Sequence, residues 1–228
     1  MTTSPPDPAR SGDSGSPPSL RERQREAARG HVAGAAGPLF LEKGYAGTTT
    51  KAIAAAAGVS EGTVYNYFGS KPEVLLEALR RLVPIRPGEL DAIRDELAAM
   101  PDGDAAIREF CRHDEEVAQR ALPLVRVFLE AAATDTEVAA RWRAQEEVRL
   151  ESQTSLLDVL GSRGWLRTDV PRDMLARQLW LTVSPEIRLK WADTGLPVED
   201  HLAWKETALR SLLLPPEAQA VGVPTAEL

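Results

Sequence analysis

The segment from Thr48 to Glu73 constrains the fold of this chain more than any other. An alanine-rich stretch, Lys51 to Ala57, is followed by the break Gly58-Val59-Ser60 and by a second short stretch that ends in Tyr-Phe. Alanine is the best helix former, glycine ends a helix in the left-handed conformation, and serine is a good N-cap. The sequence therefore predicts two short helices, about 51–57 and 61–68, joined as a helix-turn-helix.

The second of these helices is predicted to have an inner and an outer side. Val64 and Phe68 lie four residues apart and should face inward together. The side chains expected to face outward are those of Thr63, Asn66 and Tyr67, with Tyr65 at the margin. This surface would offer hydroxyl and amide groups, as a helix that enters the DNA major groove needs.

The following helix has its own boundary signals. Ser70 and Glu73 predict a capping box, and Pro72 suits the first helical turn. The helix should run over about 72–83 and end before Pro84, where we expect a domain boundary.

Three runs with fixed spacing extend this pattern: FLEKGY (40–45), TTTKAIAAAAGVS (48–60) and GTVYNYFGSK (62–71). Together they resemble the DNA-binding domain of the TetR (tetracycline-repressor-like) family, over roughly residues 20–83. The resemblance implies contacts with double-stranded DNA, with bases read from the start of the second helix and phosphates bound around it. The implied DNA-binding residues are Thr50, Lys51, Glu61, Gly62, Thr63, Tyr65, Asn66, Tyr67 and Lys71.

The distribution of charge fits a DNA-binding segment. The chain has a formal net charge of −7, but residues 1–18 carry −1, residues 19–83 carry +3 and the remaining 145 residues carry −9. The positive segment coincides with the predicted helix-turn-helix. An acidic body would be repelled by the duplex and would help to orient the protein.

The helix before this motif contains several residues that disfavour helices. It is expected over Arg21 to Lys43, yet it includes Gly30, Gly34, Gly37 and Pro38. Interior glycine costs about 1 kcal/mol and proline about 3 kcal/mol relative to alanine. We therefore expect a kink or break near Gly37. The arginines at its start (Arg21, Arg23, Arg25 and Arg29) suit either a solvated face or the DNA backbone.

The rest of the chain reads as helical, without strand-like alternation, so the predicted fold class is all-α. Expected segments are 89–100, 104–120, 122–134, 137–163, 171–192 and 198–214, with Thr136 as the cap of the long segment 137–163. The predicted organisation is a disordered tail (1–18), a helix-turn-helix domain (19–83), a helical ligand-binding and dimerisation domain (84–215) and a loose tail (216–228).

By resemblance, the second domain would hold a small-molecule effector and form a homodimer through its last two helices. Apolar stripes on those segments (Leu175, Leu179, Trp180, Val183 and Ile187, then Leu202, Leu209, Leu212 and Leu213) suit either an interface or the core of one chain. Candidate pocket residues, each also compatible with plain core packing, are Phe110, Cys111, His113, Val125, Phe128, Trp142, Trp165 and Trp180.

Other classes of protein find little support. No apolar run approaches the roughly 20 residues of a membrane span, and no signal peptide is evident, so we expect a cytoplasmic protein without membrane contact. Cys111 and His113 are too close on a helix to form a nucleophile–base pair, and phosphate-loop and dinucleotide fingerprints are missing. The run His113-Asp114-Glu115-Glu116 is interpreted as a solvated face. We expect no catalytic site, metal or cofactor.

The sequence thus predicts a ligand-responsive transcriptional regulator, most simply a repressor, which binds a palindromic operator as a homodimer and is released by a small molecule. The alternative is an architectural or adaptor DNA-binding protein without ligand response.

Overall fold

The computed structural model describes residues 19–83 and 87–216, and within them every regular element is an α-helix. This confirms the all-α prediction. The predicted tail 1–18 lies outside the described residues, as does the tail 216–228 apart from its first residue. None of the described helices is long and apolar enough to cross a membrane.

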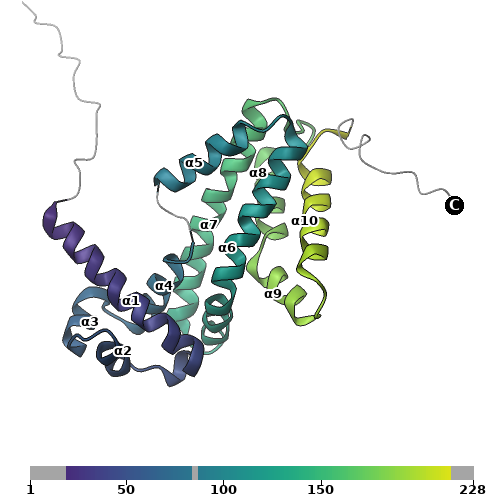
Figure 1. Ribbon diagram of the computed structural model, residues 1–228. Helices are drawn as coiled ribbons and strands as arrows, with labels where there is room; N and C mark the ends of the chain where they lie inside the picture. Colours follow the sequence, from purple (N-terminus) through teal and green to yellow (C-terminus); the bar gives the residue numbers. More distant parts are fainter. Residues whose placement is uncertain (1–18, 84–86, 217–228) are drawn as a thin grey trace, which may run out of the picture.

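The first four helices gather at one end of the molecule, in the lower left of Figure 1. They are α1 (Leu20–Gly47), α2 (Thr50–Ala56), α3 (Glu61–Phe68) and α4 (Lys71–Arg80). Helix α1 packs on α4, and α2 packs on α3.

Six further helices form the body. They are α5 (Pro87–Ala98), α6 (Gly103–Ala132), α7 (Thr136–Ser162), α8 (Arg172–Thr182), α9 (Pro185–Asp193) and α10 (Val198–Leu213). The long helices α6 and α7 pack side by side along the middle of the molecule, with α8, α9 and α10 on one side (Figure 1).

The buried apolar side chains form two cores. The first core joins α1–α4 to residues 121–131 of α6 and to Val138 and Trp142 of α7. The second core joins Leu97 of α5 to residues 106–111 of α6, residues 156–160 of α7, and the inner faces of α8 and α10. Helices α6 and α7 therefore contribute to both cores.

Helix α1 does not break near Gly37, so of the expected kink or break the break was wrong. It continues through Pro38, and its backbone first leaves the helical region at Gly44 (φ 67°, ψ 176°), one residue beyond the predicted end. Val32, Ala36 and Phe40 on this helix are fully buried in the first core. Burial of that stripe outweighs the local cost of glycine and proline.

Two other boundaries in the body were also mispredicted. The expected break between 120 and 122 is absent, because α6 continues through Pro123 with Leu122 and Leu124 buried on either side. Conversely, the expected helix 171–192 is two helices. Ser184 caps α9 through a hydrogen bond from the Ile187 amide (3.2 Å), and Pro185 begins it.

Two predicted caps are replaced by other arrangements. Ser70 precedes α4, but its side chain makes no capping hydrogen bond, and its buried Oγ has no partner among the described residues. At α7 the cap is Asp135 rather than Thr136, because the Asp135 carboxylate accepts from the amides of Glu137 and Val138.

Candidate DNA-reading surface and ligand pocket

The helix-turn-helix forms as the sequence predicts. Gly58 has φ 65°, and the Ser60 Oγ accepts a hydrogen bond from the Thr63 amide at 3.0 Å. Helix α3 spans Glu61–Phe68, with Val64 and Phe68 buried in the first core. These contacts fix α3 on α2 and leave its other side at the surface.

The two tyrosines of α3 occupy each other's expected positions. Tyr65 is half exposed (50%) and Asn66 is exposed, whereas Tyr67 is partly buried against the first core. The Tyr67 carbonyl accepts a hydrogen bond from Arg29, whose guanidinium also lies over the Phe68 ring. Tyr65 and Asn66 are therefore the side chains of α3 best placed for an external partner.

A small polar cluster joins the start of α2 to α3. The Thr50 hydroxyl donates to the Glu61 carboxylate (2.5 Å) and lies 3.3 Å from the Tyr65 hydroxyl. Thr49 caps α2 by accepting from the Ala52 amide, and Lys51 and Gly62 are exposed. The structure thus brings most of the predicted DNA-binding residues onto one surface.

Lys71 has partners within the chain. Its ammonium donates to the carbonyls of Tyr45 (2.9 Å) and Thr48 (3.1 Å) and lies over the Tyr45 ring. Burial lowers the pKa of this ammonium, with a smaller opposing effect from Asp135. Lys71 therefore ties α4 to the end of α1 and to the loop before α2.

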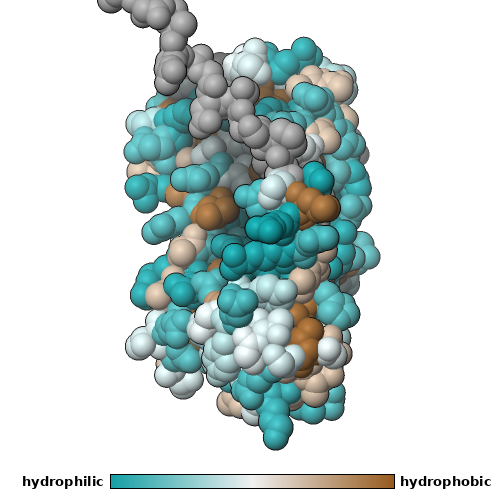
Figure 2. Space-filling model, turned by 90° about the vertical axis from the view of Figure 1, so that its left-hand side faces the viewer, coloured by the Kyte–Doolittle hydropathy of each residue, from teal (hydrophilic) through white to brown (hydrophobic). Residues whose placement is uncertain are grey.

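Two arginines of α1, for which the sequence left two interpretations open, lie in a groove beside α3. Arg21 and Arg25 of α1 line it together with Gln24, Asn66 and Tyr67, and its volume is about 600 Å³. Neither arginine forms an ion pair with another described residue. Figure 2 views the molecule from the left-hand side of Figure 1. This face is mainly hydrophilic, with small separate hydrophobic patches.

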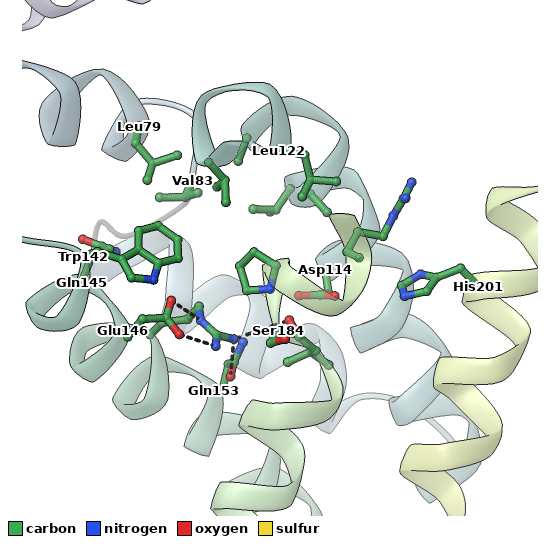
Figure 3. Close-up of a pocket in the computed structure, with 18 residues that line it drawn as sticks. Leu79, Val83, Asp114, Leu122, Trp142, Gln145, Glu146, Gln153, Ser184 and His201 are labelled. Carbon is green, nitrogen blue, oxygen red and sulfur yellow. Dashed lines mark hydrogen bonds and ion pairs between the residues drawn. The ribbon is translucent and has the colours of Figure 1, made fainter. Parts of the chain in front are cut away.

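The body contains a pocket where the two cores meet (Figure 3). It encloses about 680 Å³, counting the part open to solvent, and is lined by residues of α4, α6, α7, α9 and α10. Of the predicted pocket residues, Val125 and Trp142 line it. Phe110 and His113 line an adjoining pocket of about 810 Å³, and Trp180 lines a groove between α7 and α8.

The remaining candidates belong to the cores. The Phe128 ring lies 5.4 Å from the Trp142 ring in the first core, tilted by 45°, and Trp165 packs against the second core. Cys111 is fully buried in the second core, and its burial raises the pKa of the thiol. Cys111 is accordingly a packing residue rather than a reactive one.

The acidic run on α6 is not the solvated face that the sequence indicated. Glu115 is 5% exposed, and its carboxylate accepts bidentate hydrogen bonds from the Arg188 guanidinium (2.8–3.1 Å). Asp114 accepts from Lys205, which is 1% exposed, at 2.7 Å. Burial opposes ionisation of Glu115, but the nearby His201, Arg188 and Lys205 outweigh it and lower the pKa to about 2.

Several pocket residues were missed because their partners are remote in sequence. Arg188 lies 73 residues from Glu115, and Lys205 lies 91 from Asp114. On α7, Arg149 donates to Glu146, Gln153 and the Trp180 carbonyl. The pairings of Glu115 with Arg188 and of Asp114 with Lys205 join different helices, so no periodic pattern on one helix could reveal them.

One group of side chains has the composition of a metal site. The potential ligand atoms of Glu96, Glu109 and His113 lie within 4.8 Å of one another. Arg112 forms ion pairs with Glu109 and Glu116, and it lies 4.0 Å from Glu96. This guanidinium already neutralises the carboxylates that a cation would need.

The last helices present both buried and exposed apolar side chains. Leu175, Leu179, Leu209 and Leu213 lie in the second core of the chain itself. The large exposed side chains on these helices are Met174, Leu181 and Trp204. The predicted stripes therefore serve mainly intrachain packing, and a different set of residues faces outward.

Comparison with known proteins agrees with this architecture. Residues 34–78 match the family described as "Bacterial regulatory proteins, tetR family". The transcriptional regulator RutR of Escherichia coli K12 is 32% identical over 193 residues, which cover 82% of this chain and 88% of RutR. The transcriptional repressor AcnR of Corynebacterium efficiens is 27% identical over 139 residues, 60% of this chain and 67% of AcnR. A match to YerO of Bacillus subtilis, 36% identical over 63 residues, spans 28% of this chain but only 22% of that relative.

A solved structure from Mesorhizobium loti, described as a TetR-family transcriptional regulator, superimposes with a TM-score of 0.61 at 20% identity. The superposition covers 84% of this chain and 99% of that one, and shows a shared fold.

Proposed function

Because the chain belongs to the TetR family of bacterial transcriptional regulators, we propose that it is a repressor whose DNA binding is released by a small molecule. It acts as a homodimer on a palindromic operator in the cytoplasm. The observation that carries the ligand response is the position of the pocket against α4, the helix that supports the DNA-reading pair.

Helix α4 forms part of the pocket wall. Leu79 lines the pocket, as does Val83 just beyond the helix, and the Arg80 Nε donates to the Gln145 Oε1 at 3.3 Å. In the same half of α4, Glu77 forms an ion pair with Arg29 of α1 (3.3 Å), and Arg29 in turn donates to the Tyr67 carbonyl near the end of α3. A ligand that displaces Leu79 or competes for Gln145 would therefore favour a different position of α4.

A ligand shifts such an equilibrium only by its difference in affinity for the two states. The proposal therefore requires that the effector bind more tightly to the chain free in solution than to the chain on DNA. Binding of effector and operator must then weaken each other by the same factor.

The dimer is proposed through α8 and α10, where Met174, Leu181 and Trp204 are exposed. A twofold axis would present two copies of α3 to successive major grooves, so each operator half-site would be the inverse of the other. Tyr65, Asn66, Lys51 and Thr63 are the proposed principal contacts.

The test is selection of bound sequences from a random DNA pool by the purified protein, followed by binding at several salt concentrations. We expect an enriched palindrome with two half-sites about one DNA turn apart or more. Uniform recovery of the pool with strong salt dependence would instead indicate an architectural DNA-binding protein.

A double variant of α3 tests which surface reads the DNA. Tyr65→Phe with Asn66→Ala should weaken binding to the selected palindrome by about tenfold or more while leaving the dimer intact. The matched control is Gln119→Ala, on an exposed position of α6. Unchanged affinity of the α3 variant would refute the assigned contacts.

A further inference from the structure

The charged groups around the pocket compensate one another. Three acids face it or lie directly behind it, and each has its own base: Asp114 with Lys205 (2.7 Å), Glu115 with Arg188 (2.8 Å), and Glu146 with Arg149 (2.7 Å). Four of these six line the pocket, namely Asp114, Glu146, Arg149 and Arg188, whereas Glu115 and Lys205 do not. The pocket therefore presents no uncompensated charge.

Some hydrogen-bonding groups remain unused. The Arg80 guanidinium donates to the Gln145 Oε1, and Arg149 donates to the Gln153 Oε1 at 3.2 Å. These donors fix which end of each amide is oxygen. The two amide NH₂ groups then have no acceptor among the described residues, although Gln145 is only 8% exposed.

His201 is a third polar side chain of the pocket, and it lies next to Glu115. It lines the pocket and is 2% exposed, and neither of its ring nitrogens makes a hydrogen bond with a described residue. Its Nδ1 lies 3.5 Å from the Glu115 carboxylate without hydrogen-bond geometry. A buried polar group without a partner is costly, so a ligand that satisfies it gains affinity.

The remaining walls are apolar, with Leu79, Val117, Leu122, Val125, Trp142 and Val183 among them. We propose that the pocket takes a neutral, largely apolar molecule that carries an oxygen acceptor for the amides of Gln145 and Gln153. This inference rests on the proposed function only in treating the pocket as the effector site.

The balance of charge makes an ionic ligand unfavourable. A carboxylate or sulfonate would have to draw a guanidinium or ammonium away from its buried acid, and a cation would have to separate an acid from its base. Either change leaves an unpaired buried charge, which costs more than one hydrogen bond gives back.

The experiment compares two naphthalene dyes with the full chain. The neutral ketone 6-propionyl-2-(dimethylamino)naphthalene has one carbonyl acceptor, and 1-anilinonaphthalene-8-sulfonate carries a negative charge. We expect the ketone to bind one per chain and at least about tenfold more tightly than the sulfonate. Equal or tighter binding of the sulfonate, or no binding of the ketone, would overturn the inference.

Two variants locate the bound ketone. Ala118→Phe fills the pocket from α6 and should abolish binding, whereas Ala140→Phe, at an exposed position of α7, should not. Gln153→Leu should weaken binding by about three- to tenfold and shift the ketone emission to the blue, because the carbonyl loses a donor. The matched control is Gln119→Leu. Binding that survives Ala118→Phe, or emission unchanged by Gln153→Leu, would contradict the proposed site.

Failure of this inference can be told apart from failure of the proposed function. If the chain selects a palindrome but does not bind the ketone, the proposed regulator stands and the proposed ligand class is wrong. If the chain binds the ketone in the pocket but selects no palindrome, the ligand class stands and the proposed regulator is wrong.

Discussion

The DNA-reading helices and the body differ in where they keep their polar side chains. Among residues 19–83, the one fully buried polar side chain is that of Thr48, which follows α1 and whose hydroxyl donates to the Leu39 and Gly44 carbonyls. The body buries five: Glu115, Gln145, Ser184, His201 and Lys205. The first region is held by apolar packing, by caps and by the partly buried contacts of Arg29 and Lys71. The body joins distant helices through charged pairs, whose strength depends on how those helices are placed.

The largest expected effect comes from breaking a buried pair in the body. Glu115→Gln leaves Arg188 without its charged partner and should lower the free energy of unfolding at pH 7 by about 3 kcal/mol. Denaturant unfolding monitored by circular dichroism measures it. The matched control Glu116→Gln, whose partner Arg112 is at the surface, should cost less than about 1 kcal/mol.

The same pair should respond to pH. The pKa of Glu115 is lowered from 4.5 to about 2, so its contribution to stability is complete above about pH 4.5 and is lost as the pH falls toward 2. The difference between wild type and Glu115→Gln should therefore shrink over that interval. A difference that stays constant from pH 7 to pH 2 would show that Glu115 is not held as an ionised partner.

In the DNA-reading region, removing surface charge should change binding rather than stability. Arg21→Ala with Arg25→Ala should lower the slope of log affinity against log salt concentration by about 1.8 for each half-site, which corresponds to about 30-fold weaker binding of each half-site near 0.15 M salt. Thermal unfolding should not change. Arg108→Ala with Arg120→Ala, at exposed positions of α6, is the control. An unaltered salt slope would place both α1 arginines away from the phosphates.

The smallest effect distinguishes two serines that look alike in sequence. Ser60→Ala removes a capping hydrogen bond from α3 and should cost about 1 kcal/mol of stability. Ser70→Ala removes a hydroxyl that caps nothing and should be close to neutral. Denaturant unfolding of the two variants decides it, and equal losses would mean that Ser60 does not act as a cap.

The sequence predictions were most accurate where residues close together in the sequence determine the structure. The bounds of α3, its cap at Ser60 and the inward positions of Val64 and Phe68 depend on neighbours within a few residues, and these predictions were confirmed. The exchanged positions of Tyr65 and Tyr67 follow from helix spacing, because Tyr67 is three residues from the buried Val64 and lies on the same face of α3. The resemblance identified the family, but it could not supply this local detail.

Predictions failed where remote packing decides the outcome. Pro38 and Pro123 remain inside helices because the residues around them are buried against other helices. Glu115 is buried only because Arg188 approaches from α9. The predicted domain bounds, the DNA contacts and the dimer remain predictions.

The sharing of α6 and α7 between the two cores has a consequence for cooperativity. A fragment ending at residue 83 would expose Leu75, Leu76 and Leu79, which pack in a core completed by α6 and α7. The DNA-reading helices should therefore unfold together with the adjoining half of α6 and α7, and not as a separate unit. A molecule bound where the two cores meet would then raise the melting temperature of both.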